Sequence, residues 1–151
     1  MASFFFDSSA LVKLYHVEAG SAVVDSLLRG ADSRIVISRL TVVELVSAFA
    51  VKQRTQMLTA KDAEAGRLRF LYDVANGRLT VITVREPHYL TAQRLIIGYG
   101  GTKGVRALDA IQLGVALDVK NLGVSVFVAA DRTLMEIARS EGLSVLNPED
   151  P

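Results

Sequence analysis

The chain has 151 residues, half of them hydrophobic, a formal net charge of +1 and a mean hydropathy of +0.33. This length and composition predict one domain with a single buried core. The lack of cysteine excludes disulfides and cysteine–zinc sites and is consistent with a cytoplasmic protein. No apolar run reaches the roughly 20 residues that a membrane span needs, and the first residues lack the basic region and cleavage site of a signal peptide.

Short apolar segments alternate with helical patterns along the chain. The expected strands are residues 3–6, 35–37, 79–84, 124–128 and 143–146. The expected helices are residues 8–15, 20–28, 42–54, 59–75, 86–98, 106–118 and 132–140. Such alternation predicts a parallel sheet whose strands are joined by right-handed crossovers.

Three local expectations accompany this pattern. The glycine-rich segment 98–104 is expected to be the most flexible part of the chain, either a mobile loop at the site entrance or a simple connection. His16 and His88 are expected on helix surfaces. Leu108 is expected among the core residues of its helix.

Four acidic residues lie at comparable junctions of strand and helix. Asp7 ends the first strand, and Asp131 follows the strand 124–128. Glu44 lies in the first turns of one helix, and Asp109 lies near the start of another. Ligands of parallel α/β sheets bind at the carboxyl ends of strands, so we expect the four carboxylates to converge. Converging carboxylates repel one another, and Mg²⁺ or Mn²⁺ would remove that conflict.

Each acid also has an ordinary structural explanation. Asp7 and Asp131 can cap the helices that follow them, and Glu44 can be a first-turn acid that interacts with the helix dipole. Asp109 fits this explanation worst, because a cap there would interrupt a continuous apolar helix.

The arginines Arg106 and Arg132 each neighbour one of these acids. Each can contact a substrate phosphate or form a structural ion pair, and the sequence leaves both open. The middle of the chain is basic, since only four acids oppose ten lysines and arginines there. The ten are Lys52, Arg54, Lys61, Arg67, Arg69, Arg78, Arg85, Arg94, Lys103 and Arg106. A basic face suits a nucleic acid, but solvated helix faces have the same composition.

Four segments around these acids resemble, in order and spacing, the motifs of PIN-domain proteins, above all the VapC toxins of bacterial and archaeal toxin–antitoxin pairs. The segments are Asp7–Tyr15, Ser38–Leu45, Arg106–Leu113 and Val128–Arg132. The resemblance covers essentially the whole chain and implies a single PIN domain over residues 1–151. It implies a three-layer α/β sandwich in which a five-stranded parallel sheet, in the order 3-2-1-4-5, has helices on both faces.

The resemblance also implies a Mg²⁺- or Mn²⁺-dependent endoribonuclease that hydrolyses RNA with an activated water. Asp7 and Asp109 would be the main metal ligands, and Glu44 and Asp131 would complete the site through water or a second ion. Ser8 or Ser9 would supply a supporting hydroxyl. The chain departs from many family members at one position, since Ala129 stands where they carry threonine or serine two residues before the last acid.

The partners that the resemblance implies are a VapB-like antitoxin, bound near Val42–Ala50 so that it blocks the site, and a second copy of the chain in a homodimer. The apolar residues of this helix can instead fill the core. One alternative is a PIN-like RNA- or protein-binding module with weak or no nuclease activity. Another is a phosphoryl-receiver domain, although such domains usually need paired acids after the first strand and a late lysine, where this chain has Asp7 alone and Arg132.

Overall fold

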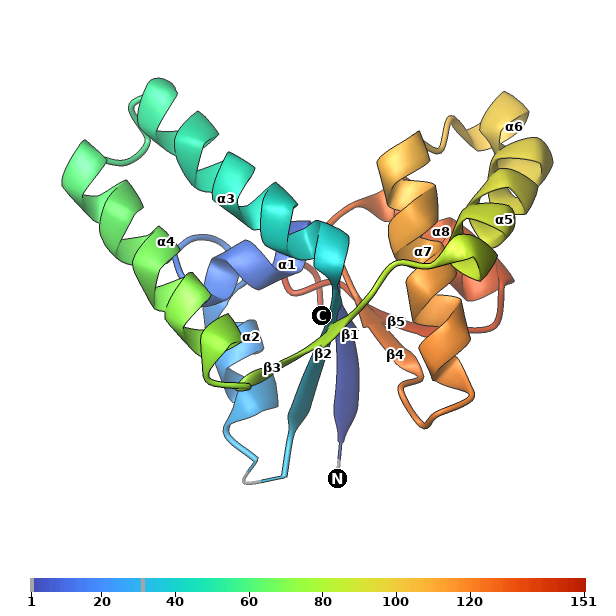
Figure 1. Cartoon of the computed structure of the whole chain (residues 1–151), viewed down its shortest axis with the longest axis horizontal. Helices are drawn as coiled ribbons and strands as arrows, with labels where there is room; N and C mark the ends of the chain where they lie inside the picture. The colour runs from blue at the N-terminus through green and yellow to red at the C-terminus, as the bar shows by residue number, and fades with distance from the viewer. Residues whose placement is uncertain (1, 31) are drawn as a thin grey trace.

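The structure is a computed structural model that describes residues 2–30 and 32–151. Its centre is a parallel sheet with the strand order β3-β2-β1-β4-β5, drawn in Figure 1. The strands are β1 (Ser3–Phe6), β2 (Arg34–Ser38), β3 (Leu79–Ile82), β4 (Val126–Val128) and β5 (Ser144–Leu146). This order confirms the predicted sheet and differs from the 2-1-3-4-5 order of flavodoxin-like receiver domains, which argues against the receiver alternative.

Helices cover both faces of the sheet, as predicted. One face carries α1 (Ser8–Leu11), the 3-10 turn η1 (Val12–Leu14), α2 (Ser21–Leu28), α3 (Arg39–Arg54) and α4 (Ala60–Ala75). The other face carries α5 (Glu86–Leu95), α7 (Ala107–Lys120) and α8 (Arg132–Ser140), with the π-turn η2 (Ile96–Gly100) and α6 (Gly101–Lys103) between α5 and α7. Figure 1 shows the two groups of helices spreading apart on either side of the strands.

Side-chain alternation along the strands builds one core on each face of the sheet, where the sequence predicted a single core. Phe5 and Phe127 stack on the α7 side of the sheet, with ring centroids 5.9 Å apart. Their neighbours Phe6 and Val128 point to the α3 side. Strands that are buried on both faces have continuous apolar sequences, and for this reason short apolar runs predicted parallel strands.

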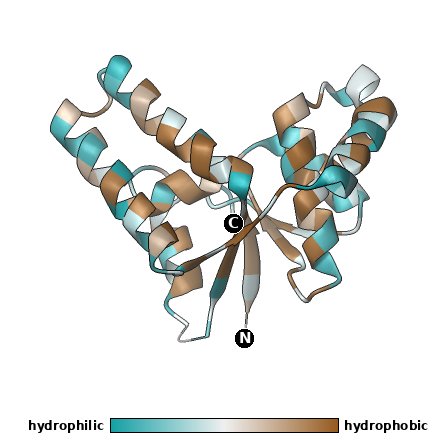
Figure 2. Ribbon diagram, viewed as in Figure 1, coloured by the Kyte–Doolittle hydropathy of each residue, from teal (hydrophilic) through white to brown (hydrophobic). Residues whose placement is uncertain are grey.

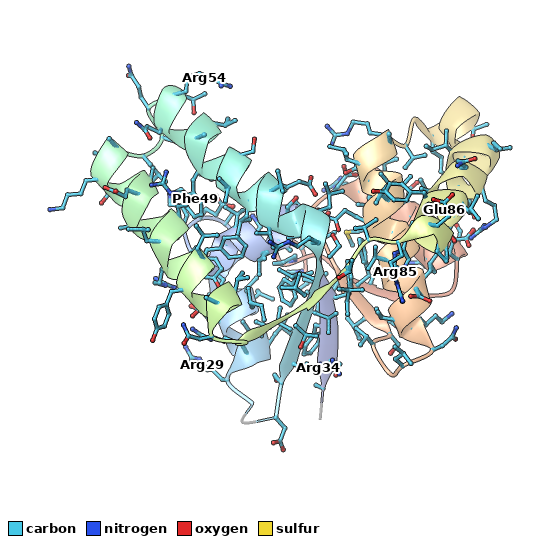
Figure 3. All side chains as sticks on the ribbon, viewed as in Figure 1. Arg29, Arg34, Phe49, Arg54, Arg85 and Glu86 are labelled. Carbon is cyan, nitrogen blue, oxygen red and sulfur yellow. The ribbon has the colours of Figure 1, made fainter. Side chains whose placement is uncertain are left out.

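Helix α3 divides its residues between the core and the surface. Phe49 is buried between α3 and α4, where Gly66 leaves room for its ring, since a Cβ at Gly66 would lie 2.6 Å from that ring (Figure 3). Figure 2 colours much of the first half of α3 as hydrophobic. Val43, in this helix, is 65% exposed. Part of the segment Val42–Ala50 therefore fills the core, and part remains on the surface.

The glycine-rich segment is not the loop that the sequence predicted. Residues 96–103 continue α5 as η2 and α6, and the helical path ends at Gly104, whose φ is +73°. The Tyr99 hydroxyl donates to Glu141, and Lys103 pairs with Glu136, so two contacts join this arm to the α8 region. Tertiary contacts have overridden the low helix propensity of glycine.

His88 is buried, which contradicts its predicted surface position. Its Nδ1 accepts the Arg85 backbone N–H at the start of α5, and its Nε2 lies 3.0 Å from Asp118 Oδ2. Gly114 permits α7 to approach α5, because a Cβ there would lie 2.9 Å from the His88 carbonyl oxygen. Leu108 was also predicted wrongly, since it is 51% exposed instead of buried.

Within residues 2–30 and 32–151, no helix is both long enough and apolar enough to cross a bilayer.

Candidate active site

Asp7 ends β1 and caps α1, with only 4% of its surface exposed. Its Oδ2 accepts the Ser9 backbone N–H at 3.1 Å and the Ser9 hydroxyl at 2.6 Å. The Ser9 oxygen in turn accepts the Ala130 N–H at 3.0 Å, which connects the end of β1 to the end of β4. The other carboxylate oxygen, Oδ1, is buried and has no hydrogen-bond partner among the residues described. Asp7 is therefore held firmly on one side and unsatisfied on the other.

Glu44 lies in the second turn of α3, so the first-turn explanation of this acid is wrong. Its Oε1 accepts the Gln112 side-chain amide, and its Oε2 lies 3.4 Å from the Ser8 hydroxyl. Gln112 is fully buried and also bonds to Ser38 and Thr41 at the start of α3. It thus joins α7 to α3 and fixes the position of Glu44.

Sequence reasoning missed Gln112. The available signal was its position three residues after Asp109, which places it on the same helix face, inside an otherwise apolar run. A buried amide in such a run needs polar partners, and here two hydroxyls and a carboxylate provide them.

Asp109 and Asp131 line one small cavity of about 110 Å³ together with Arg106. Asp109 lies in the first turn of α7, and its Oδ2 accepts the Arg106 Nε–H at 2.9 Å. Asp131 caps α8, since its Oδ1 accepts the Leu134 backbone N–H at 2.9 Å. Asp131 and Asp7 are therefore helix caps as well as members of the acidic group.

The electrostatics show that the acids act on one another. Burial raises the pKa of Asp7 against the opposing hydrogen bonds from Ser9, and the charge of Asp109 raises it further. Burial also raises the pKa of Glu44, to which the charges of Asp7 and Asp109 contribute. The hydrogen bond to Asp109 raises the pKa of Arg106, and the charges of Asp131 and Asp7 add to this effect.

The convergence is incomplete in this arrangement of side chains. Within residues 2–30 and 32–151, no three histidine, aspartate or glutamate side chains are disposed around a single metal position. Glu44 is bonded to Gln112, Asp109 to Arg106, and Asp131 to the start of α8. The residues nevertheless fit a divalent cation chemically, because all donors are carboxylate oxygens and Asp7 Oδ1 is buried without a partner.

The structure also places Arg132 and Ala129, which lie close to Asp131 in the sequence. Arg132 is exposed, and no ion pair or side-chain hydrogen bond of it is found within the described ranges. Ala129 is fully buried in the core on the α7 side, and its N–H donates to the Leu146 carbonyl. The hydroxyl next to the Asp7 carboxylate is therefore that of Ser9.

The fold and this edge of the sheet define a parallel α/β domain with an acidic pocket at its strand ends. A family model described as "PIN domain" matches residues 4–140. The chain belongs to the PIN domain family, and this confirms the resemblance that the motifs suggested.

A curated relative gives a more detailed comparison. "Ribonuclease VapC45" of Mycobacterium tuberculosis (strain CDC 1551 / Oshkosh) is 31% identical over 144 residues, which cover 93% of this chain and 92% of the relative.

Solved structures share the fold. VapC20 of Mycobacterium tuberculosis, described as a sarcin-ricin loop cleaving toxin, has a TM-score of 0.65 and 15% identity, covering 93% of this chain and 95% of the other. VapBC2 of Rickettsia felis, bound to a DNA fragment from its promoter, has a TM-score of 0.64 and 16% identity, covering 96% of this chain and 98% of the other.

Proposed function

We propose that this chain is a divalent-metal-dependent endoribonuclease, the toxin of a type II toxin–antitoxin pair, acting in the cytoplasm as a single PIN domain over residues 1–151. The observation that carries the proposal is the Oδ1 of Asp7, which is buried and has no hydrogen-bond partner among the described residues. The charge of Asp109 raises the pKa of Asp7, and the charges of both aspartates raise the pKa of Glu44. RNA as the substrate is supported by the relative named as a ribonuclease, which is similar over nearly the whole chain.

In this proposal Asp7 and Asp109 are the main ligands of Mg²⁺ or Mn²⁺, and Glu44 and Asp131 complete the site through water or a second ion. The bound cation would activate a water and stabilise charge on the phosphodiester. Gln112 holds Glu44 in place, and Ser9 holds Asp7. Ser8, at 3.4 Å from Glu44, is the second supporting hydroxyl.

Cationic side chains near the acids can bind the RNA backbone. Arg132, next to Asp131 in the chain, is exposed, and Arg106 lies against the acids themselves. Guanidinium groups match the geometry of phosphate oxygens, and they fix the position of a strand without reading its sequence. We therefore expect RNA affinity to fall steeply as salt rises.

The test is cleavage of a structured RNA in Mg²⁺ or Mn²⁺ by the wild type, Asp7→Asn and Asp109→Asn, with a chelator as a further arm. We expect cleavage by the wild type alone and its loss with chelator. Equal cleavage by all three proteins would contradict the proposal, because it would show a contaminating nuclease. RNA binding without metal-dependent cleavage would instead support the alternative of a binding module.

A second proposed role is binding of a VapB-like antitoxin along α3, near Val42–Ala50. Two adjoining grooves of about 520 and 380 Å³ share Leu40, Val43 and Leu108, so the three form one apolar strip between α3 and α7. Glu44 and Ser8 line the larger groove. A segment bound there would lie directly beside the acids and could block access to them. An apolar strip of this kind is typical of protein–protein contacts.

Val43→Glu tests this role, since Val43 is 65% exposed and its replacement should leave the fold intact. We expect the variant to lose co-purification with the product of a short neighbouring reading frame. Leu122→Glu, at a 75% exposed position beyond the end of α7, is the matched control and should keep its partner. Light scattering on the same samples tests the proposed homodimer, which a stable monomer would contradict.

A further inference from the structure

Arg106 holds an unusual position among the cations of this protein. Its Nε–H donates to Asp109 Oδ2 at 2.9 Å, and it lines the small cavity with Asp109 and Asp131. The negative charge of Asp7 also attracts it, so one guanidinium interacts with three of the four acids, Asp109, Asp131 and Asp7. In the described part of the chain, Nε carries the only hydrogen bond of this guanidinium group.

The pair that Arg106 makes is easy to break. The arginine side chain is 78% exposed, whereas that of Asp109 is only 15% exposed. Arg106 occupies the N-cap position of α7 without making a side-chain cap, and it follows the helix-ending Gly104 by two residues. An exposed ion pair three residues apart on a helix contributes little to stability. Neither packing nor capping holds the guanidinium in this place.

A divalent cation and Arg106 need the same carboxylate. Two positive groups on one carboxylate repel each other, and this repulsion weakens the binding of both. The divalent ion carries the larger charge and prefers oxygen ligands, so it displaces the guanidinium. The displaced arginine is then free, next to the site, with a donor geometry that suits a phosphate.

We propose that Arg106 is a built-in counter-ion that competes with the divalent cation for Asp109 and leaves this carboxylate when the cation binds. This inference rests on the proposed function. It resolves the choice that the sequence left open, because Arg106 is an ion-pair partner of the acids in one state and available to phosphate in the other.

The first test measures Mn²⁺ affinity directly, from the electron paramagnetic resonance signal of free Mn²⁺ during a titration. We expect Arg106→Gln to bind Mn²⁺ about three- to fivefold more tightly than the wild type, the effect of releasing one exposed ion pair. Arg106→Lys keeps the charge and should stay near the wild type. Arg132→Gln is the matched control and should change the affinity less than twofold, since this arginine also neighbours a site acid but has no ion pair with any residue that the structure describes.

The second test observes the arginine itself. In ¹⁵N-resolved spectra, the Nε–H signal of Arg106, assigned by its absence in Arg106→Gln, should shift and exchange faster as diamagnetic Mg²⁺ is added. The Arg132 signal should stay unchanged. Both tests are binding measurements and need no RNA cleavage.

The outcomes separate this inference from the proposed function. Suppose that the wild type binds Mn²⁺, that Asp7→Asn does not, and that Arg106→Gln binds Mn²⁺ no more tightly than the wild type. The counter-ion role is then wrong, while the proposed metal site keeps its support. The same conclusion follows if the Arg106 Nε–H signal neither shifts nor exchanges faster at saturating Mg²⁺. If the wild type binds no Mn²⁺ at millimolar concentration, the proposed metal site and the counter-ion role both fail.

Discussion

Two clusters of ionisable side chains are built from the same two parts of the chain, the segment after β1 and helix α3. The first cluster contains Asp7 and Glu44 from these two parts, together with Asp109 and Asp131 from elsewhere in the chain. The second contains Lys13, from η1, and Lys52, two helical turns beyond Glu44 on α3. The partners of these two lysines are Glu18 and Glu149.

The clusters differ in how well their charges are compensated. Lys13 Nζ lies 3.0 Å from Glu18 and 2.6 Å from Glu149, and Lys52 Nζ lies 2.8 Å from Glu18, so two cations meet two anions. In the acidic cluster, by contrast, the guanidinium of Arg106 acts on three of the four carboxylates, those of Asp109, Asp131 and Asp7, and no other cation pairs with the four among the described residues.

The pKa shifts follow this difference. Burial raises the pKa of Glu18, but the hydrogen bonds from Lys52 and Lys13 outweigh it and leave a lowered pKa. Burial raises the pKa of Asp7 and Glu44, and there the neighbouring charges add to the shift. A balanced cluster stabilises a fold, whereas an unbalanced one is typical of a functional site.

The largest effect that this comparison predicts is on catalysis. Asp7→Asn should lower RNA cleavage more than about 100-fold, which is beyond the loss usual for residues that only support metal ligands. The same change should leave the free energy of unfolding unchanged or higher, since asparagine still caps a helix and the repulsion is removed. Cleavage assays and urea denaturation of the same samples measure both. A variant that loses activity only because it unfolds would contradict the assignment.

The balanced cluster should give the opposite result. Lys13→Met removes a lysine whose side chain is only 3% exposed and its contacts with Glu18 and Glu149, and should lower the free energy of unfolding by about 1–3 kcal/mol. Under conditions where the variant is folded, cleavage should persist. Lys61→Met on the exposed face of α4 is the control and should cost less than about 0.5 kcal/mol. A loss as small as that of the control would show that the network is not structural.

Gln112 links the acidic cluster to the core, so its replacement should affect both properties moderately. Gln112→Leu removes the donor to Glu44 and leaves Ser38 and Thr41 with fewer partners. We expect about a 10- to 100-fold loss of cleavage, mainly as a higher Mn²⁺ requirement, and a loss of about 1–3 kcal/mol in stability. Gln93→Leu, at an exposed position on α5, is the control. Unchanged cleavage with lowered stability would make Gln112 a core residue only.

The smallest effect is on the pH dependence of stability, where the clusters should have opposite signs. Because the folded pKa of Glu18 is lowered, its stabilisation is complete above the ordinary value of 4.5 and is lost as the pH falls below it. Because the folded pKa of Glu44 is raised, this residue favours unfolding as the pH rises above that same value.

The measurement is urea denaturation without added metal between about pH 3 and 7. Compared with the wild type, Glu18→Gln should lose stability at neutral pH and show a flatter dependence below pH 4.5, whereas Glu44→Gln should gain stability at neutral pH. The same sign of change for both variants would contradict the contrast between the clusters.

The local sequence pattern predicted much of the secondary structure. The apolar run before Asp7 predicted a buried strand, which the structure confirms as β1, and the explanation of Asp7 and Asp131 as helix caps is confirmed as well. The order of the strands came from the family motifs. Where local propensity competed with distant contacts, the prediction was wrong, as at the glycine-rich segment that Tyr99 and Lys103 join to the α8 region.

The sequence by itself determined which side chains have the chemistry for a metal site, because strand ends and helix starts fix the positions of Asp7, Glu44, Asp109 and Asp131. Only the tertiary structure decided the partners of these acids. The Gln112 hydrogen bond to Glu44 and the hydrogen bond between Ser9 and Ala130 join segments far apart in the chain, and the local sequence does not specify them. The Arg106–Asp109 ion pair spans only three residues, and the structure selects it from the two roles that the sequence left open. The physical reason is that hydrogen bonds and charge interactions depend on distances in space, which the chain sets only when the sheet and its two helical layers have packed.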